Sequence, residues 1–132
     1  MKKALLAAAA SLSLFAFSGR ALAHHGGAAY DADHPMTMTG TVKELLFIQP
    51  HPLITLEVKN EQGAVAEWSV EMTAPNHLAH YGWNGKKLKP GDQITVVGLP
   101  ARNGLKVLNL RKVSWANGEA IPMGPPPQPG QE

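Results

Sequence analysis

Cysteine is absent from the 132-residue sequence. Without a thiol, the chain forms no disulfide, holds no iron–sulfur cluster and has no cysteine nucleophile. It also lacks the cysteine that a bacterial lipoprotein signal requires, so we do not expect a lipid anchor. These absences direct attention to imidazole chemistry, for which the sequence has six histidines.

A long hydrophobic run is also missing. The most apolar segment, residues 4–17, has 14 residues, whereas a membrane-spanning helix needs about 20. This segment follows Lys2 and Lys3 and precedes Ala21-Leu22-Ala23, which is a small-x-small pattern. The arrangement predicts a cleaved signal peptide over residues 1–23, export to the periplasm and no stable membrane insertion after cleavage.

The mature chain has no surplus of positive charge. Three of the twelve Lys+Arg residues lie in the signal and none of the ten Asp+Glu residues do, so cleavage changes the formal charge from +2 to −1. A binder of nucleic acid needs a cationic surface to neutralise phosphates, and that partner is therefore not expected. The remaining length suits one small domain and excludes a multidomain enzyme.

Five segments have the composition and alternation of β-strands. They are residues 37–48, 53–59, 64–72, 93–99 and 105–115. A short helix is predicted between the third and fourth segments, with Thr73 as its cap and Pro75 near its first turn. This order is typical of an all-β, five-stranded OB-fold-like barrel with one short helix. The competing architecture is a five-stranded sandwich with a helical loop.

The organisation around the barrel follows from local composition. Residues 24–36 are predicted to be a flexible N-terminal lead, residues 37–118 the barrel and residues 119–132 a proline-rich disordered tail. Within the first strand, Gly40 suits a bend, and the slip of the pattern at Lys43-Glu44 suits a β-bulge. A similar change of register is predicted in the last strand after Leu110.

The sharpest hypothesis concerns the new N-terminus. Cleavage after Ala23 would begin the mature chain at His24, whose free amine and imidazole can chelate one metal ion, and His25 adds a second imidazole. The α-amine has a pKa of about 7.7 and is partly deprotonated at neutral pH. Nitrogen-rich sets of this kind favour Cu(II). The alternative is a solvated start that binds metal only adventitiously.

A second candidate set follows ten residues later. His34 precedes Met36 and Met38, which lie two residues apart on a predicted strand and so share a face. Two thioethers with an imidazole suit Cu(I), and small periplasmic copper carriers of the OB-fold type use a similar set with a nearby tryptophan. The alternative is that both methionines simply pack, which methionine does well.

His51 lies between Pro50 and Pro52, in the connection between the first two strands. The prolines hold the backbone extended around the histidine, which favours a pre-organised ligand or proton carrier. Glu71, on the polar face of the third strand, is a candidate partner of His51 or of a metal. Otherwise His51 is a turn histidine and Glu71 an ordinary solvated glutamate.

The other histidines and the known catalytic motifs point to no reaction. His77 and His80 are three apart on the short helix, but no carboxylate or cysteine has a zinc-site spacing nearby, so they are interpreted as surface histidines. Nucleophile elbows, glycine-rich phosphate loops, zinc-protease helices and paired catalytic carboxylates are absent from the sequence. We therefore expect a protein that is not an enzyme.

Several short motifs form a set whose order and spacing are fairly specific. They are His24-His25, Tyr30-Asp31, Thr39-Gly40-Thr41-Val42, Pro50-His51, Glu67-Trp68 with Glu71, Pro75-Asn76 with Leu78, Gly82-Trp83 and Leu88-Lys89-Pro90-Gly91-Asp92. On these motifs the sequence resembles an exported bacterial family, domain-of-unknown-function family 6152, over nearly all of the mature chain. That family usually has asparagine before Pro-His where this chain has Gln49, and Met36 with Met38 is not one of its hallmarks. The resemblance implies a secreted or periplasmic β-barrel and supplies no activity.

The sequence thus predicts a non-enzymatic periplasmic domain that binds a small ligand or a metal ion, with copper as the specific expectation. His24 and His25 would carry Cu(II). His51 with Glu71 is the second candidate set, and His34 with Met36 and Met38 is the third. The alternative function is an envelope structural module that binds a protein or glycan through the barrel face around Trp68 and Glu71, with an envelope protein as its partner.

Overall fold

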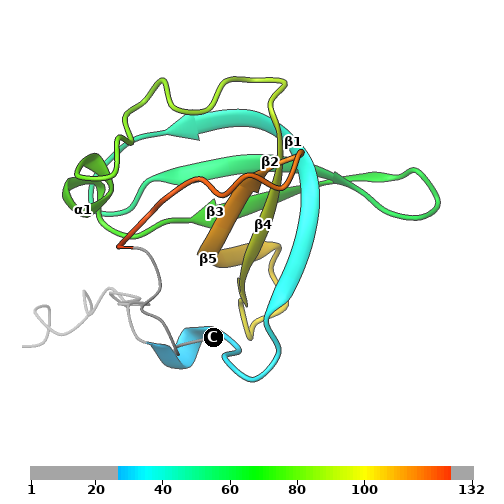
Figure 1. Ribbon diagram of the computed structural model, residues 1–132. Coiled ribbons are helices and arrows are strands. Elements are labelled where there is room, and N and C mark those ends of the chain that lie inside the picture. Colours follow the sequence, from blue (N-terminus) through cyan, green and yellow to red (C-terminus); the bar gives the residue numbers. More distant parts are fainter. Residues whose placement is uncertain (1–26, 126–132) are drawn as a thin grey trace, which may run out of the picture.

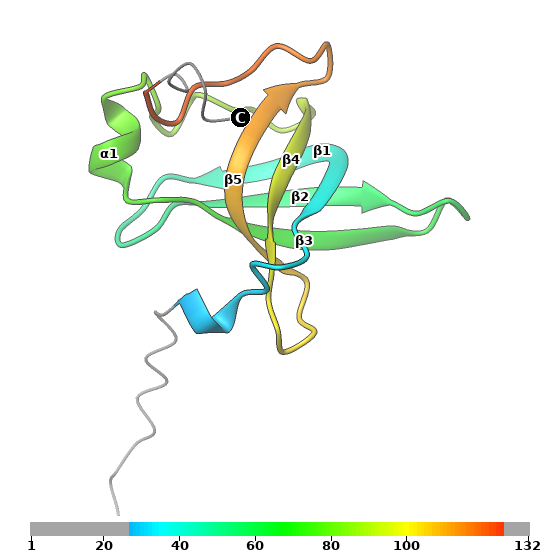
Figure 2. The same cartoon turned by 60° about the horizontal axis from the view of Figure 1, so that its bottom comes forward.

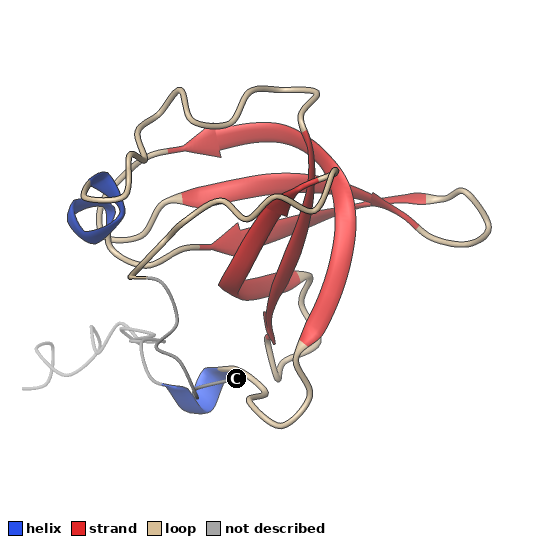
Figure 3. Ribbon diagram, in the orientation of Figure 1, coloured by secondary structure: helices blue, strands red, loops and turns tan. Residues whose placement is uncertain are grey.

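The computed structural model describes residues 27–125, and these residues form a closed five-stranded barrel. Figures 1 and 3 show the strands wrapped around one core, with a short helix at one end of the barrel. The elements are η1 (Gly27–Ala29), β1 (Met36–Leu46), β2 (Leu53–Lys59), β3 (Val65–Glu71), α1 (Pro75–Ala79), β4 (Gln93–Pro100) and β5 (Val107–Trp115). The predicted fold class is confirmed, including the helix between the third and fourth strands.

The strands follow one another around the barrel in the order β1-β2-β3-β5-β4, and β4 closes it against β1. The β3–β5 pair is parallel and the other four pairs are antiparallel. The long first strand, β1, pairs with β4 along its first half and with β2 along its second half. Its residues 36–41 pair with β4 and its residues 41–46 pair with β2, with the predicted bulge between Val42 and Glu44.

Two glycines allow the strands to cross closely. A Cβ atom on Gly40 would lie 2.5 Å from the backbone oxygen of Glu57, and one on Gly98 would lie 2.5 Å from that of Asn109. Gly98 adjoins the position where the β4–β5 pairing skips Arg111. That skip explains why the inward pattern of β5 passes from Leu110 to Val113, as predicted. Glycine in a strand commonly marks such a close approach of two backbones.

The core follows the alternation of the strands, because successive side chains point to opposite faces. In β2 the inward side chains are Ile54 and Leu56, and in β3 Val70 is fully buried. Leu78 of α1 and Trp83 join the same core cluster and close one end of the barrel. Within residues 27–125, no helix has the length and apolar character needed to cross a membrane.

The N-cap of the helix lies one residue later in the chain than predicted. Its N-cap is Ala74, which makes no side-chain capping bond, and Thr73 lies outside the helix. The physical reason is Pro75 at the helix start, because a residue before proline is pushed to extended backbone angles. Ala74 has φ −54° and ψ 140°, which is the non-helical conformation of an N-cap.

The first part of the predicted tail packs on the barrel. Ile121 is only 3% exposed, and its N–H donates to the backbone oxygen of Val113 at 2.9 Å. The Trp83 indole N–H donates to the Pro122 oxygen at 2.7 Å, and the His77 Nε2 atom lies 3.0 Å from the Met123 oxygen. The ordered barrel domain therefore extends past residue 118, although the proline content predicted a tail from residue 119. Residues 126–132 lie outside the described part of the chain, as do the predicted signal peptide and residues 24–26.

Candidate metal-binding site

Three polar side chains meet on the outer surface of the barrel at the end of β3. Glu71 is the last residue of that strand and is paired with Leu53 of β2 and Asn109 of β5. Its side chain points away from the core because the preceding residue in the strand points inward. His51 approaches from the β1–β2 connection, and Tyr30 approaches from the segment after η1. We call these three residues the Tyr30–Glu71–His51 cluster.

The two oxygens of Glu71 have different neighbours. The Tyr30 hydroxyl donates a hydrogen bond to Glu71 Oε2 at 2.7 Å. The other oxygen, Oε1, lies 3.8 Å from His51 Nε2, and the two side chains are 20% and 35% exposed. A carboxylate oxygen and an imidazole nitrogen thus face each other at a partly solvated position, while the second oxygen is held by the phenol.

Tyr30 acts in this cluster as a neutral donor. Burial, together with the hydrogen bond to Glu71 and the charge of that carboxylate, raises the pKa of Tyr30 from 10.0 to about 12. Each of these effects disfavours the phenolate. At neutral pH the phenol keeps its proton and fixes the orientation of Glu71, whose other oxygen, Oε1, faces the His51 ring.

Replacing Glu71 with glutamine is expected to lower the pKa of Tyr30 only part of the way toward 10.0, because the carboxylate is lost but the burial stays. The pKa of Tyr30 is higher in the folded protein than in the unfolded chain, so the protonated phenol contributes to the free energy of unfolding below pH 10. That contribution is lost as the pH rises through about 12. The variant should therefore lose less stability over that interval. Tyrosinate absorbance in a Tyr81→Phe background measures the pKa directly. Glu67→Gln, on the same strand, is the matched control, and an unchanged Tyr30 pKa in Glu71→Gln would refute this interpretation.

The chain segment that carries Tyr30 is fastened to the β4–β5 turn. Tyr30 forms an isolated antiparallel bridge with Ala101. The Arg102 N–H donates to the Ala29 oxygen at 2.9 Å, and the Asp31 N–H donates to the Pro100 oxygen at the same distance. The Arg102 side chain adds a third bond, from Nε to the Tyr30 oxygen at 3.1 Å. The described chain therefore begins with η1 and a segment that is bonded to the β4–β5 turn beside the cluster.

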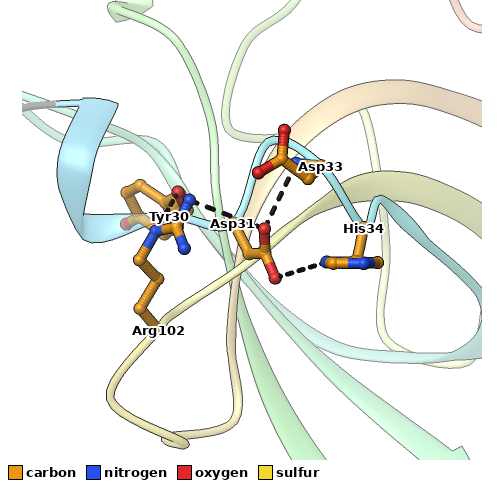
Figure 4. A network of polar contacts seen from close by, with 5 residues as sticks. All are labelled: Tyr30, Asp31, Asp33, His34 and Arg102. Carbon is orange, nitrogen blue, oxygen red and sulfur yellow. Dashed lines mark hydrogen bonds and ion pairs between the residues drawn. The ribbon is translucent and has the colours of Figure 1, made fainter.

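A second polar network stabilises the same segment (Figure 4). Asp31 Oδ2 lies 2.9 Å from His34 Nδ1, and Asp31 Oδ1 lies 3.6 Å from an Arg102 guanidinium nitrogen. Asp31 Oδ1 also accepts a bond from the Asp33 N–H at 3.2 Å. The hydrogen bond with His34 is the largest of the effects that hold the pKa of Asp31 below its usual value. This network occupies one nitrogen of the predicted ligand His34.

The structure brings together only some of the predicted ligands. It places His51 and Glu71 side by side. In contrast, Met38 is packed in the core, while Met36 is exposed at the start of β1. Within residues 27–125, no three histidine, aspartate or glutamate side chains gather into a group that could hold a metal ion. His24 and His25, the first-ranked candidates, lie outside the described residues.

Two contributors to the site were not predicted as such from the sequence. Tyr30 had a signal, because it belongs to the Tyr30-Asp31 motif, but its contact with Glu71 joins residues 41 positions apart. Arg102 lies in a turn, and no motif in the sequence marked it as part of the site. His77 of α1 and His80, the residue that caps the end of α1, are exposed, and the His77 ring lies 5.3 Å from the Tyr81 ring.

A family model described as "Family of unknown function (DUF6152)" matches residues 10–119, which is most of the chain. The search of curated proteins found no match.

Proposed function

The chain belongs to the DUF6152 family of unknown function, and we propose that it is a non-enzymatic, periplasmic domain that binds a metal ion, copper before others. The observation that carries the proposal is that the two carboxylate oxygens of Glu71 have different neighbours. One oxygen is bonded to a neutral phenol at 2.7 Å, and the other faces the His51 nitrogen at 3.8 Å. Such outer partners orient metal ligands and hold them in one geometry.

The Tyr30–Glu71–His51 cluster supplies two ligands, so the remaining ligands must come from elsewhere. His24 and His25 precede Tyr30 by only six and five residues, of which Gly27–Ala29 form η1. Three residues of 3₁₀ helix rise about 6 Å and three extended residues span roughly 10 Å, so the segment reaches up to about 16 Å. Because Tyr30 is bonded to Glu71 and fastened to the β4–β5 turn, the mature N-terminus is tethered within reach of the cluster. The amine and ring of His24, the ring of His25, His51 and Glu71 form a nitrogen-rich set suited to Cu(II).

The lower-ranked alternatives have less support. His34 with Met36 and Met38 would need Met38 to leave the core and His34 to leave Asp31. An envelope interaction module would use the barrel face around Trp68 and Glu71. Trp68 packs against the core, and Glu71 is engaged by Tyr30, so these two side chains offer a partner little free surface.

Calorimetric titration of Cu(II) into the processed domain, beginning at His24, tests the proposal. We expect His51→Ala and Glu71→Gln each to weaken Cu(II) binding at least about tenfold, since each removes one ligand. His80→Ala removes an exposed histidine at the end of α1 instead, and this variant should bind Cu(II) like the wild type. Wild-type affinity in both cluster variants would exclude His51 and Glu71 from the site.

A further inference from the structure

A groove with both signs of charge lies far from the cluster described above. It forms where β1 passes from its pairing with β2 to its pairing with β4. The β2–β3 hairpin, which projects from the barrel in Figures 1 and 2, contributes Lys59 and Val65 to its walls. The groove has a volume of about 220 Å³, and its walls carry the side chains of Thr39, Thr41, Glu57, Lys59, Val65 and Gln93. It is smaller than the sites of about 300–1,000 Å³ that hold drug-sized molecules, so a ligand there would be small.

The charged walls are set by strand geometry. Glu57 and Lys59 are two residues apart in β2, so their side chains leave the same face of the sheet. Among the described residues neither belongs to an ion pair, and Lys43, the nearby cation on β1, is bonded to Glu67 at 2.9 Å. The groove therefore presents one carboxylate and one ammonium group, neither of which forms a close ion pair, and Lys43 attracts Glu57 only at longer range.

This combination selects among ligand classes. A phosphate or another anion would be attracted by Lys59 but repelled by Glu57. A metal cation would be attracted by Glu57 but repelled by Lys59. A neutral sugar would use neither charge, and the walls offer no aromatic ring for it to stack on. A molecule with a carboxylate and an ammonium group satisfies both charges. The Thr41 hydroxyl and the Gln93 amide add neutral donors and acceptors.

We propose that this groove is a second binding site, for a small zwitterion of the amino-acid type. Lys59 would bind the carboxylate of the ligand, Glu57 its ammonium group, and Val65 its apolar carbon atoms. The site is independent of the metal proposal. Lys59 pairs with Val65 at one end of the β2–β3 hairpin and Leu53 pairs with Glu71 at the other, and six residues of strand separate the two sites by roughly 20 Å.

A ¹H–¹⁵N NMR titration of the processed domain with alanine, in the presence of a metal chelator, tests this site. We expect saturable shifts at the amides of Thr41, Lys59 and Val65, with a Kd on the order of 1 mM for so small a ligand. Acetate and ethylammonium, which each carry one of the two charges, should bind at least about tenfold more weakly. The chelator separates this result from Cu(II) binding, so either proposal can fail alone.

Two substitutions that each remove one charge make the test specific. Lys59→Gln and Glu57→Gln are surface substitutions, so the spectrum of each variant should still be that of a folded protein. Each should weaken the binding of alanine at least about tenfold. Lys112→Gln, an exposed lysine on β5, should have no effect. The proposal is overturned by the absence of saturable shifts with alanine, by equal binding of acetate or ethylammonium, or by wild-type affinity in both groove variants.

Discussion

A Pro-Pro extension before His24 is expected to weaken Cu(II) binding by about a hundredfold or more. The extension converts the amine of His24 into an amide and so removes the chelate formed by the amine and the ring of His24. A proline at the second position has no N–H, so the new N-terminus cannot replace that chelate with one made of its amine, deprotonated amides and a histidine at the third position. Losing a direct ligand should cost at least as much as losing an outer-sphere partner, which typically costs 10–100-fold. Calorimetry on the processed and extended domains measures the difference.

The matched control is an extension at the other end of the chain, after Glu132, which leaves the N-terminal amine unchanged. It should bind Cu(II) with the affinity of the unextended domain. If the N-terminal extension also binds with that affinity, the amine is not a ligand. In that outcome His51 and Glu71 could still be ligands, because their variants report on the cluster separately.

Alanine at Gly98 is expected to destabilise the barrel by about 3 kcal/mol or more, a large share of the stability of a small domain. The new Cβ would lie 2.5 Å from the Asn109 oxygen and 2.7 Å from Leu108 Cγ. Neither neighbour moves cheaply. Asn109 pairs with both β4 and β3, and the Leu108 side chain is fully buried. Urea unfolding followed by circular dichroism measures the loss.

Gly85→Ala provides the control for this substitution. Its Cβ would meet only the Phe47 Cβ, at an ordinary contact distance of 3.7 Å, so a change within about 0.5 kcal/mol is expected. If Gly98→Ala unfolds at the same urea concentration as Gly85→Ala, the close approach of β4 and β5 does not depend on glycine.

The barrel was predictable because its information is local. Alternation marks the buried side chains of β2 and β3, Gly104 with φ +78° forms the turn before β5, and Pro75 marks the start of α1. These features depend on backbone geometry and on side-chain periodicity over a few residues. The competing sandwich contains the same strands, so only the β1–β4 and parallel β3–β5 pairings distinguish the barrel.

The site was less predictable because it is assembled from distant segments. Sequence reasoning could suggest that His51 and Glu71 are partners, since a strand end and a neighbouring connection often meet. It could not show that Tyr30 covers Glu71 or that Arg102 fastens the N-terminal segment, because these contacts depend on how the closed barrel places its β4–β5 turn. Ile121 was missed for another reason. The proline-rich composition around it predicts no strand, yet one apolar side chain and two backbone carbonyls suffice to dock the segment.

The most direct test of the metal-binding account is metal analysis of the protein isolated from the periplasm of copper-replete cells, with N-terminal sequencing of the same sample. The account predicts a chain that begins at His24 and carries copper in a stoichiometric amount. A chain that begins at His24 but is isolated without copper, or one that carries copper with a different N-terminus, would contradict it.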